Sequence, residues 1–166
     1  MTKTKKLALL AALTAVALTI FVAEAQIPPV VPVPGVKLGL ANIMTLVTMA
    51  LLGRREAGAV LVVRLILGSA FAGGFSGLMF SAAGGAAAYI VMCLLIKVFP
   101  EKLMWVVSVL AALAHNAGQL AVAVWVSGSA SMLYYGTVLA AAGVITGVFT
   151  GFGAMYLTRA AKKLVK

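Results

Sequence analysis

Apolar residues fall in six long runs along the chain, separated by short connections of Pro, Gly, Ser or charged residues. An α-helix needs about 20 apolar residues, within a range of roughly 17–25, to cross the hydrocarbon core of a bilayer. The pattern therefore predicts an all-α, polytopic membrane protein in which residues 1–166 form a single domain of six transmembrane helices. The second and third runs are short, so we expect neighbouring helices or a thinned bilayer to accommodate them. The predicted spans are about 7–26, 38–53, 57–72, 77–97, 103–126 and 132–158.

Positive charges are distributed unevenly between the connections. Both termini and the even-numbered connections carry the Lys and Arg residues, whereas the odd-numbered connections, 27–37, 73–76 and 127–131, are nearly free of charge. Because Lys and Arg accumulate on the cytoplasmic side of a membrane, this alternation predicts a multi-pass protein of the cytoplasmic membrane with both termini in the cytoplasm. The cationic clusters are Lys3, Lys5 and Lys6; Arg54 and Arg55; Lys97 and Lys102; and Arg159, Lys162, Lys163 and Lys166.

The first run also resembles a signal peptide. Lys3–Lys6 precede the apolar stretch, and Ala23-Glu24-Ala25 has the small-x-small pattern of a cleavage site. Cleavage there would leave five spans and place the new N-terminus outside. Since the run is long enough to cross a bilayer, we expect it to be retained as the first span.

The composition narrows the possible functions. Hydrophobic residues make up 64% of the chain and charged residues 10%, against roughly 45–50% and about 25% in soluble domains. The three acids are all Glu, and without Asp the chain cannot build an Asp-rich magnesium–diphosphate site or a Ser-His-Asp triad. The sequence contains neither a GxxxxGK[ST] phosphate loop nor metal-ligand spacing, and the lone Cys93 cannot form an internal disulfide. We therefore expect no enzyme activity, cofactor or metal in this chain. Its net charge is +10, but the cations flank the apolar runs, so nucleic acid is not an expected partner.

A charged residue lies at the centre of the third predicted span. Inserting a charge at that depth costs about 2.5–3.5 kcal/mol, so Arg64 must face the interior of the bundle and is a candidate ligand-binding residue. The structural alternative is an Arg paired with Glu24 or with carbonyls at a helix end.

The fifth predicted span carries the densest group of polar residues. At about 100° per residue, Gln119 and Asn116 lie about 40° and 100° around the helix from His115, so all three project within one sector. They are candidates for the lining of a polar pocket; the alternative is a hydrogen-bond network that only packs helices together.

A further polar group lies where the second span begins. Lys37 is the only cation on the predicted outer side, and Asn42 lies just over one turn further inward. A helix N-terminus there would favour an anionic ligand group, although Lys37 could instead extend to lipid headgroups. Glu24 is a candidate counter-charge. Because Lys37 and Arg64 outnumber Glu24, we expect a small anionic or polar ligand rather than a cation.

The connection after the first span has four prolines within seven residues, Pro28 to Pro34. It cannot continue a helix and favours an extended conformation. The 27–36 loop is therefore either a stiff connector or a lid over the pocket.

Small residues at four-residue spacing occur on two spans. Gly143, Gly147 and Gly151 give the sixth span a smooth face, which favours packing inside the bundle over a partner interface. An Ala-xxx-Ala face on the first span is formed by Ala8, Ala11, Ala12 and Ala15.

These motifs resemble a known family. Pro-x-Pro-Gly-Val-Lys-Leu-Gly-Leu-Ala-Asn (Pro32–Asn42), Arg64 in the third span and Ala-His-Asn-x-Gly-Gln (Ala114–Gln119) resemble the Gx transporter family, whose members are also named heptaprenyl diphosphate synthase component I. The resemblance extends over essentially the whole chain. That family is similar in turn to the substrate-binding S components of energy-coupling factor (ECF) transporters. The resemblance implies a six-helix bundle, an outward pocket capped by the first loop, and an alanine face that docks a coupling subunit.

Three functions follow as hypotheses. The first is the S subunit of an ECF-type importer, embedded in the lipid bilayer, whose partner ATPases use ATP and whose substrate is bound by Lys37, Asn42, Arg64, His115, Asn116 and Gln119. The second is a non-catalytic membrane component of heptaprenyl or polyprenyl diphosphate synthesis, with an isoprenoid-like anionic ligand. The third is a structural subunit of a larger membrane complex, for which Gln119→Leu should be tolerated.

Overall fold

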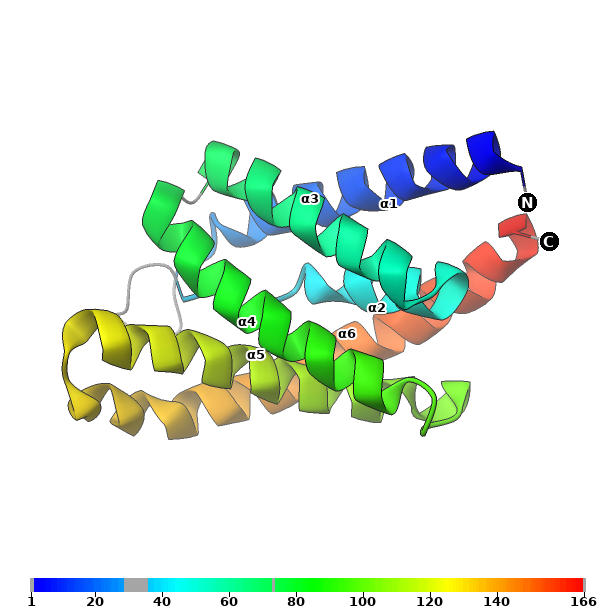
Figure 1. The fold of residues 1–166 in the computed structure, drawn as a ribbon. Coiled ribbons are helices and arrows are strands. Elements are labelled where there is room, and N and C mark those ends of the chain that lie inside the picture. Colours follow the sequence, from blue (N-terminus) through cyan, green and yellow to red (C-terminus); the bar gives the residue numbers. More distant parts are fainter. Residues whose placement is uncertain (1, 29–35, 73, 166) are drawn as a thin grey trace.

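The computed structural model describes residues 2–28, 36–72 and 74–165, with side chains as far as residue 162. In these residues six α-helices account for most of the chain and no strand occurs, which confirms the prediction of an all-α protein. The helices lie along one long bundle (Figure 1). Their bounds are α1 Lys3–Glu24, α2 Asn42–Leu52, α3 Arg54–Ala72, α4 Gly74–Leu95, α5 Met104–Ser127 and α6 Gly136–Val165, with 3₁₀ turns η1 Glu101–Leu103 and η2 Ala130–Tyr135.

Each predicted span overlaps one helix, but the helices differ in their capacity to cross a membrane. Four are long and apolar enough: α1, α4, α5 with η1, and α6 with η2. The 11 residues of α2 reach only about 16 Å, roughly half the thickness of a bilayer core. The 19-residue α3 is less apolar because three charged residues open it and Arg64 interrupts it. The structure therefore supports four candidate spans directly, and a full crossing by the α2 and α3 regions stays a prediction.

The outside of the bundle is apolar, and part of the inside is polar. Large apolar side chains such as Phe75 and Phe149 are 79% and 72% exposed. Charged and amide side chains such as Arg64 and Gln119 are 2% and 0% exposed. A soluble protein shows the opposite arrangement, whereas a bundle surrounded by lipid buries its polar groups. This distribution supports a membrane-embedded protein.

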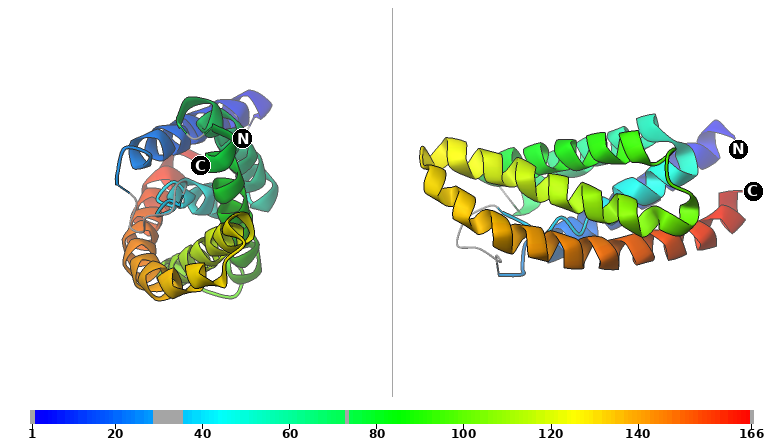
Figure 2. Two further views of the ribbon diagram at one scale, coloured as in Figure 1. Left: turned by 90° about the vertical axis from the view of Figure 1, so that its left-hand side faces the viewer. Right: turned by 90° about the horizontal axis from the view of Figure 1, so that it is seen from below.

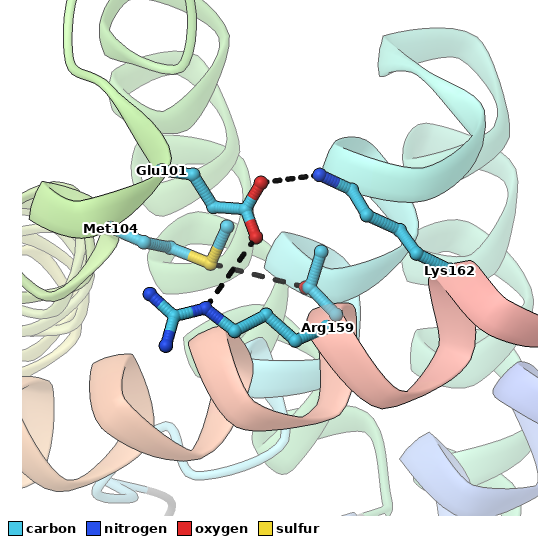
Figure 3. Close-up of polar contacts among 5 residues, drawn as sticks. Glu101, Met104, Arg159 and Lys162 are labelled. Atoms are coloured by element: carbon cyan, nitrogen blue, oxygen red, sulfur yellow. Dashed lines mark hydrogen bonds and ion pairs between the residues drawn. The ribbon is translucent and has the colours of Figure 1, made fainter.

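The segments that carry the described cationic residues, at the start of α1 and of α3, between α4 and α5, and at the end of α6, lie at the end of the bundle with both termini (Figures 1 and 2). There Lys6 of α1 pairs with Glu56 of α3. Glu101 of η1 pairs with Lys162 and lies 3.8 Å from the Nε atom of Arg159, both from α6 (Figure 3). These pairs connect neighbouring helices at the end predicted to face the cytoplasm.

The glycines of α6 pack against α5, as the sequence predicts. A Cβ atom at Gly147 would lie 2.6 Å from the Cα of Val109, and one at Gly151 would lie 2.4 Å from the Cα of Trp105. Real side chains do not approach a backbone so closely, so glycine is what allows the two helices to lie in contact. Packing within the bundle is therefore the role of this face.

The alanine face of α1 points away from the bundle. Its four members are all exposed in the structure: Ala8, Ala11, Ala12 and Ala15. Buried positions on α1, such as Leu13 and Ala17, belong to the main apolar core instead. The alanine face is therefore available to lipid or to a partner helix.

Candidate functional site

The segment of residues 36–41 enters the bundle as a non-helical stretch and a turn, and α2 begins only after it (Figures 1 and 2). Side chains from two other helices hold its backbone. Glu24, at the end of α1, accepts a hydrogen bond from the Gly39 N–H at 2.5 Å. Gln119 of α5 accepts from the Lys37 N–H at 2.7 Å and donates to the Lys37 carbonyl at 2.9 Å. The segment is thus fixed between α1 and α5 without being helical.

The imidazole of His115 lies between two glycines. Gly39 has a φ of +78°, a left-handed conformation that favours glycine. A Cβ atom there would lie 2.8 Å from the Cδ2 atom of His115. On the other side of the ring, a Cβ at Gly84 of α4 would lie 2.7 Å from its Cε1 atom. The ring is therefore clamped between the 36–41 segment and α4.

A chain of buried polar side chains links three helices through this ring. Arg64 of α3 donates from Nη2 to the Oδ1 of Asn42, at the start of α2, at 3.2 Å. The Nδ2 of Asn42 lies 3.1 Å from the Nδ1 of His115 on α5. The Nε2 of His115 in turn contacts the Nε2 of Gln119. All four side chains are buried, so the chain of contacts forms a closed polar centre.

Two cations lie close to one aromatic ring in this centre. The Nζ of Lys37 is 3.6 Å from the centroid of the Phe21 ring, and the Cζ of Arg64 is 5.7 Å from it. Both distances fall within the range of cation–π attraction. Within the described part of the chain, the buried Lys37 Nζ and Arg64 Nε atoms have no hydrogen-bond partner. The centre therefore holds cationic nitrogen atoms whose hydrogen-bonding capacity is unused by those residues.

Glu24 balances these cations only partly. Its carboxylate is engaged by the backbone amide of Gly39, and the amides of Leu40 and Ala41 lie close enough to act on it as well. Between the described residues, no ion pair within 4 Å joins Glu24 to Lys37 or Arg64. Two positive charges thus face one carboxylate that already binds the 36–41 segment.

Asn116 turns out to serve a different contact. Its Nδ2 donates to the carbonyl of Leu139 on α6 at 2.6 Å and lies against Gly143. The side chain therefore ties α5 to α6. Its Oδ1 has no partner among the described residues.

The structure brings five of the six predicted site residues into one connected cluster, and Asn116 lies beside it. The sequence did not single out Phe21, Gly39 or Gly84 as parts of the site. Glu24 was expected as a counter-charge, but its direct partner is the Gly39 amide. The only signal for Phe21 would have been its position one turn before Glu24.

Most of the 27–36 loop, which the sequence predicts as a connector or lid, lies outside the described residues. Its last residue, Val36, is buried and packs with Phe80, Ala123 and Leu139 in a small apolar cluster separate from the main core. The polar centre thus has an apolar neighbour made by α4, α5 and α6.

These features define a class: an all-helical membrane protein with a buried, cation-rich polar centre. In the described residues no group of side chains could hold a metal ion. A family profile with the description heptaprenyl diphosphate synthase component I matches residues 13–157, and the chain belongs to this family. This match confirms the family resemblance carried by the sequence motifs. No curated protein and no solved structure matches the chain.

Proposed function

We propose that this chain is the membrane-embedded, non-catalytic substrate-binding subunit of an ECF-type importer, and that it takes a small anionic molecule into its polar centre. The observation that carries the proposal is a pair of buried cationic nitrogen atoms, Lys37 Nζ and Arg64 Nε, that have no hydrogen-bond partner among the described residues. Buried positive charge that one carboxylate balances only partly is unfavourable, and an anionic ligand would relieve it.

The residues of the polar centre have different roles in this proposal. Lys37 and Arg64 supply positive charge, and Asn42 and His115 supply directional hydrogen bonds. Gln119 positions the 36–41 segment, because both ends of its amide are engaged by the Lys37 backbone. In this proposal the 27–36 loop closes over the ligand.

The importer proposal also needs partners, because the sequence contains no phosphate-binding loop. ATP would be used by separate ATPase subunits. The exposed alanine face of α1 would dock a coupling subunit, since small residues allow close helix contact. Six crossings with both termini in the cytoplasm would place the polar centre near mid-membrane.

The test is a comparison of small molecules that co-purify with wild type, Arg64→Gln and Arg159→Gln. Arg159 is the matched control because it is an exposed arginine at the end of the bundle that carries the termini. We expect one anionic compound with wild type and the control and at least about tenfold less with Arg64→Gln. Equal amounts in all three well-folded proteins would refute the role of Arg64. Uptake of the compound by cells expressing the same variants then tests transport itself.

The family description favours a second candidate, a membrane component that organises a soluble prenyl diphosphate synthase. The chain has no Asp, so magnesium–diphosphate chemistry would have to come from the partner. An isoprenoid diphosphate would also suit the cationic centre, because it combines an anionic head with an apolar tail. Co-purification with a soluble synthase and altered product length on deletion would favour this candidate; co-purification with ATPases would favour the importer.

A further inference from the structure

The buried polar centre has one hydrogen-bond donor too many. Its chain of contacts runs from Arg64 through Asn42 and His115 to Gln119. An arginine only donates hydrogen bonds, an asparagine amide presents one donor group and one acceptor, and a neutral histidine has one nitrogen of each kind. Whether every contact can pair a donor with an acceptor therefore depends on the group at the far end.

The far end of this chain is also a donor. The amide of Gln119 is oriented by the Lys37 backbone, since its oxygen accepts from the Lys37 N–H and its nitrogen donates to the Lys37 carbonyl. Reversing the Gln119 amide would place its N–H group against the Lys37 N–H and its oxygen against the Lys37 carbonyl. Gln119 therefore presents an N–H to the Nε2 of His115, just as Arg64 presents N–H groups to Asn42.

No choice of histidine tautomer removes the mismatch. With hydrogen on Nε2, His115 faces the N–H of Gln119; with hydrogen on Nδ1, it faces the N–H of Asn42. The backbone carbonyl of Gly84 can also accept the ring hydrogen of His115. That hydrogen then has an acceptor, but the Asn42 amide hydrogen stays unmatched. Flipping the Asn42 amide would place its N–H group against an N–H group of Arg64. Protonating the imidazole would add one more donor. One N–H group stays without an acceptor in every arrangement.

We propose that the ligand delivers an acceptor that carries no hydrogen of its own, a carboxylate or phosphate oxygen, to this unmatched N–H between Asn42 and His115, beside the cations Lys37 and Arg64. A water molecule serves less well, because its two hydrogens need further acceptors. The inference rests on the proposed function only in that the centre takes a ligand; it names the ligand's headgroup chemistry.

Asn42→Asp tests the donor count directly. The new carboxylate has nearly the shape of the amide and can accept from Arg64 and from the His115 Nδ1–H, while His115 Nε2 accepts from Gln119. Every contact would then be matched without a ligand. We expect ligand-free Asn42→Asp to melt at least about 3 °C above ligand-free wild type, although burying a charge normally destabilises a protein. Anion binding should be at least about tenfold weaker, since the added charge repels the ligand.

The state of His115 provides the deciding measurement. It is the only histidine in the chain, so ¹⁵N-histidine labelling of the full, detergent-solubilised protein gives one pair of ring signals. The probes are sodium acetate, inorganic phosphate and inorganic diphosphate, each compared with sodium chloride at equal ionic strength. We expect at least one probe to shift the wild-type ring signals, because the Asn42 N–H beside Nδ1 gains an acceptor, and to leave the ring in the neutral Nδ1–H form that Asn42→Asp shows without any probe. A response to acetate alone indicates a carboxylate headgroup, and a response to phosphate or diphosphate indicates a phosphate headgroup.

Wild-type histidine signals that respond to none of the three anions, or an Asn42→Asp protein whose ring is not the Nδ1–H form, would overturn the inference. The comparison uses purified protein and no uptake assay. A probe-dependent signal in a chain that supports no uptake would therefore retain the anion site and reject only the importer role. If Asn42→Asp does not fold, the wild-type titration still decides.

Discussion

Gln119→Leu is the sharpest test of how the 36–41 segment is held. The substitution keeps a similar size but removes both hydrogen bonds to the Lys37 backbone. Leaving a buried peptide group without a partner costs about 1–3 kcal/mol. Lys37 is half-buried, so the lower value applies to its N–H and to its carbonyl, which gives a total of about 2 kcal/mol. For a chain of this length, that loss corresponds to a melting temperature lower by about 4–8 °C.

Two measurements check this prediction. Thermal unfolding in detergent should show the lower melting temperature, and hydrogen–deuterium exchange should be faster at residues 36–41 than in wild type. Asn116→Leu is the matched control, because it lies on the same helix but contacts the carbonyl of Leu139 on α6. It should leave exchange at 36–41 unchanged. If Gln119→Leu melts as wild type does and exchanges at the wild-type rate at 36–41, the clamping role of Gln119 is wrong.

Further predictions concern glycine packing and pH. Gly84→Ala should destabilise by about 1–3 kcal/mol in thermal unfolding, since its Cβ would overlap the clamped His115 ring. Gly77→Ala, on the same helix and with nothing within 4 Å among the described residues, should be neutral or stabilising by up to about 1 kcal/mol; equal losses would refute the clamp. The hydrogen bond from Lys6 holds the pKa of Glu56 below its usual value. That contribution to stability is present above the unfolded pKa, about 4.3, and is lost as pH falls through the lower folded pKa. Melting curves of wild type and Glu56→Gln should therefore converge on acidification, and a gap that persists at low pH would contradict this pairing.

The sequence predicted the helices well because apolar runs are what define a membrane-embedded helix. The largest difference is at the second span, predicted from about residue 38, within which α2 begins at Asn42. Residues 38–41, Leu-Gly-Leu-Ala, are as apolar as a membrane helix, so hydropathy cannot distinguish this non-helical segment from a helical turn. The conformation depends on Gly39 at positive φ and on side chains of α1 and α5 that bind the backbone.

Polar site residues could be found from the sequence because each is unfavourable in an apolar span. Arg64, His115 and Gln119 stand out for that reason, and the structure places them in one cluster. Phe21 and Gly84 resemble dozens of other apolar or small residues, and only their neighbours reveal that they flank Lys37 and His115. The structure also removes one sequence-based test. Gln119→Leu would be harmful even in a purely structural subunit, so tolerance of that change does not separate the hypotheses.

The position of the polar centre bears on the choice between the two proposed functions. The short α2 occupies the part of the bundle nearer the termini, whereas the 36–41 segment lies toward the opposite end (Figure 1). At the end with the termini, Lys6–Glu56 and Glu101–Lys162 pairs connect neighbouring helices. A ligand arriving from the far end meets the non-helical 36–41 segment, which rearranges more easily than packed helices. If that end faces outward, as the charge distribution predicts, ligand access from outside favours uptake over transfer to a soluble synthase in the cytoplasm.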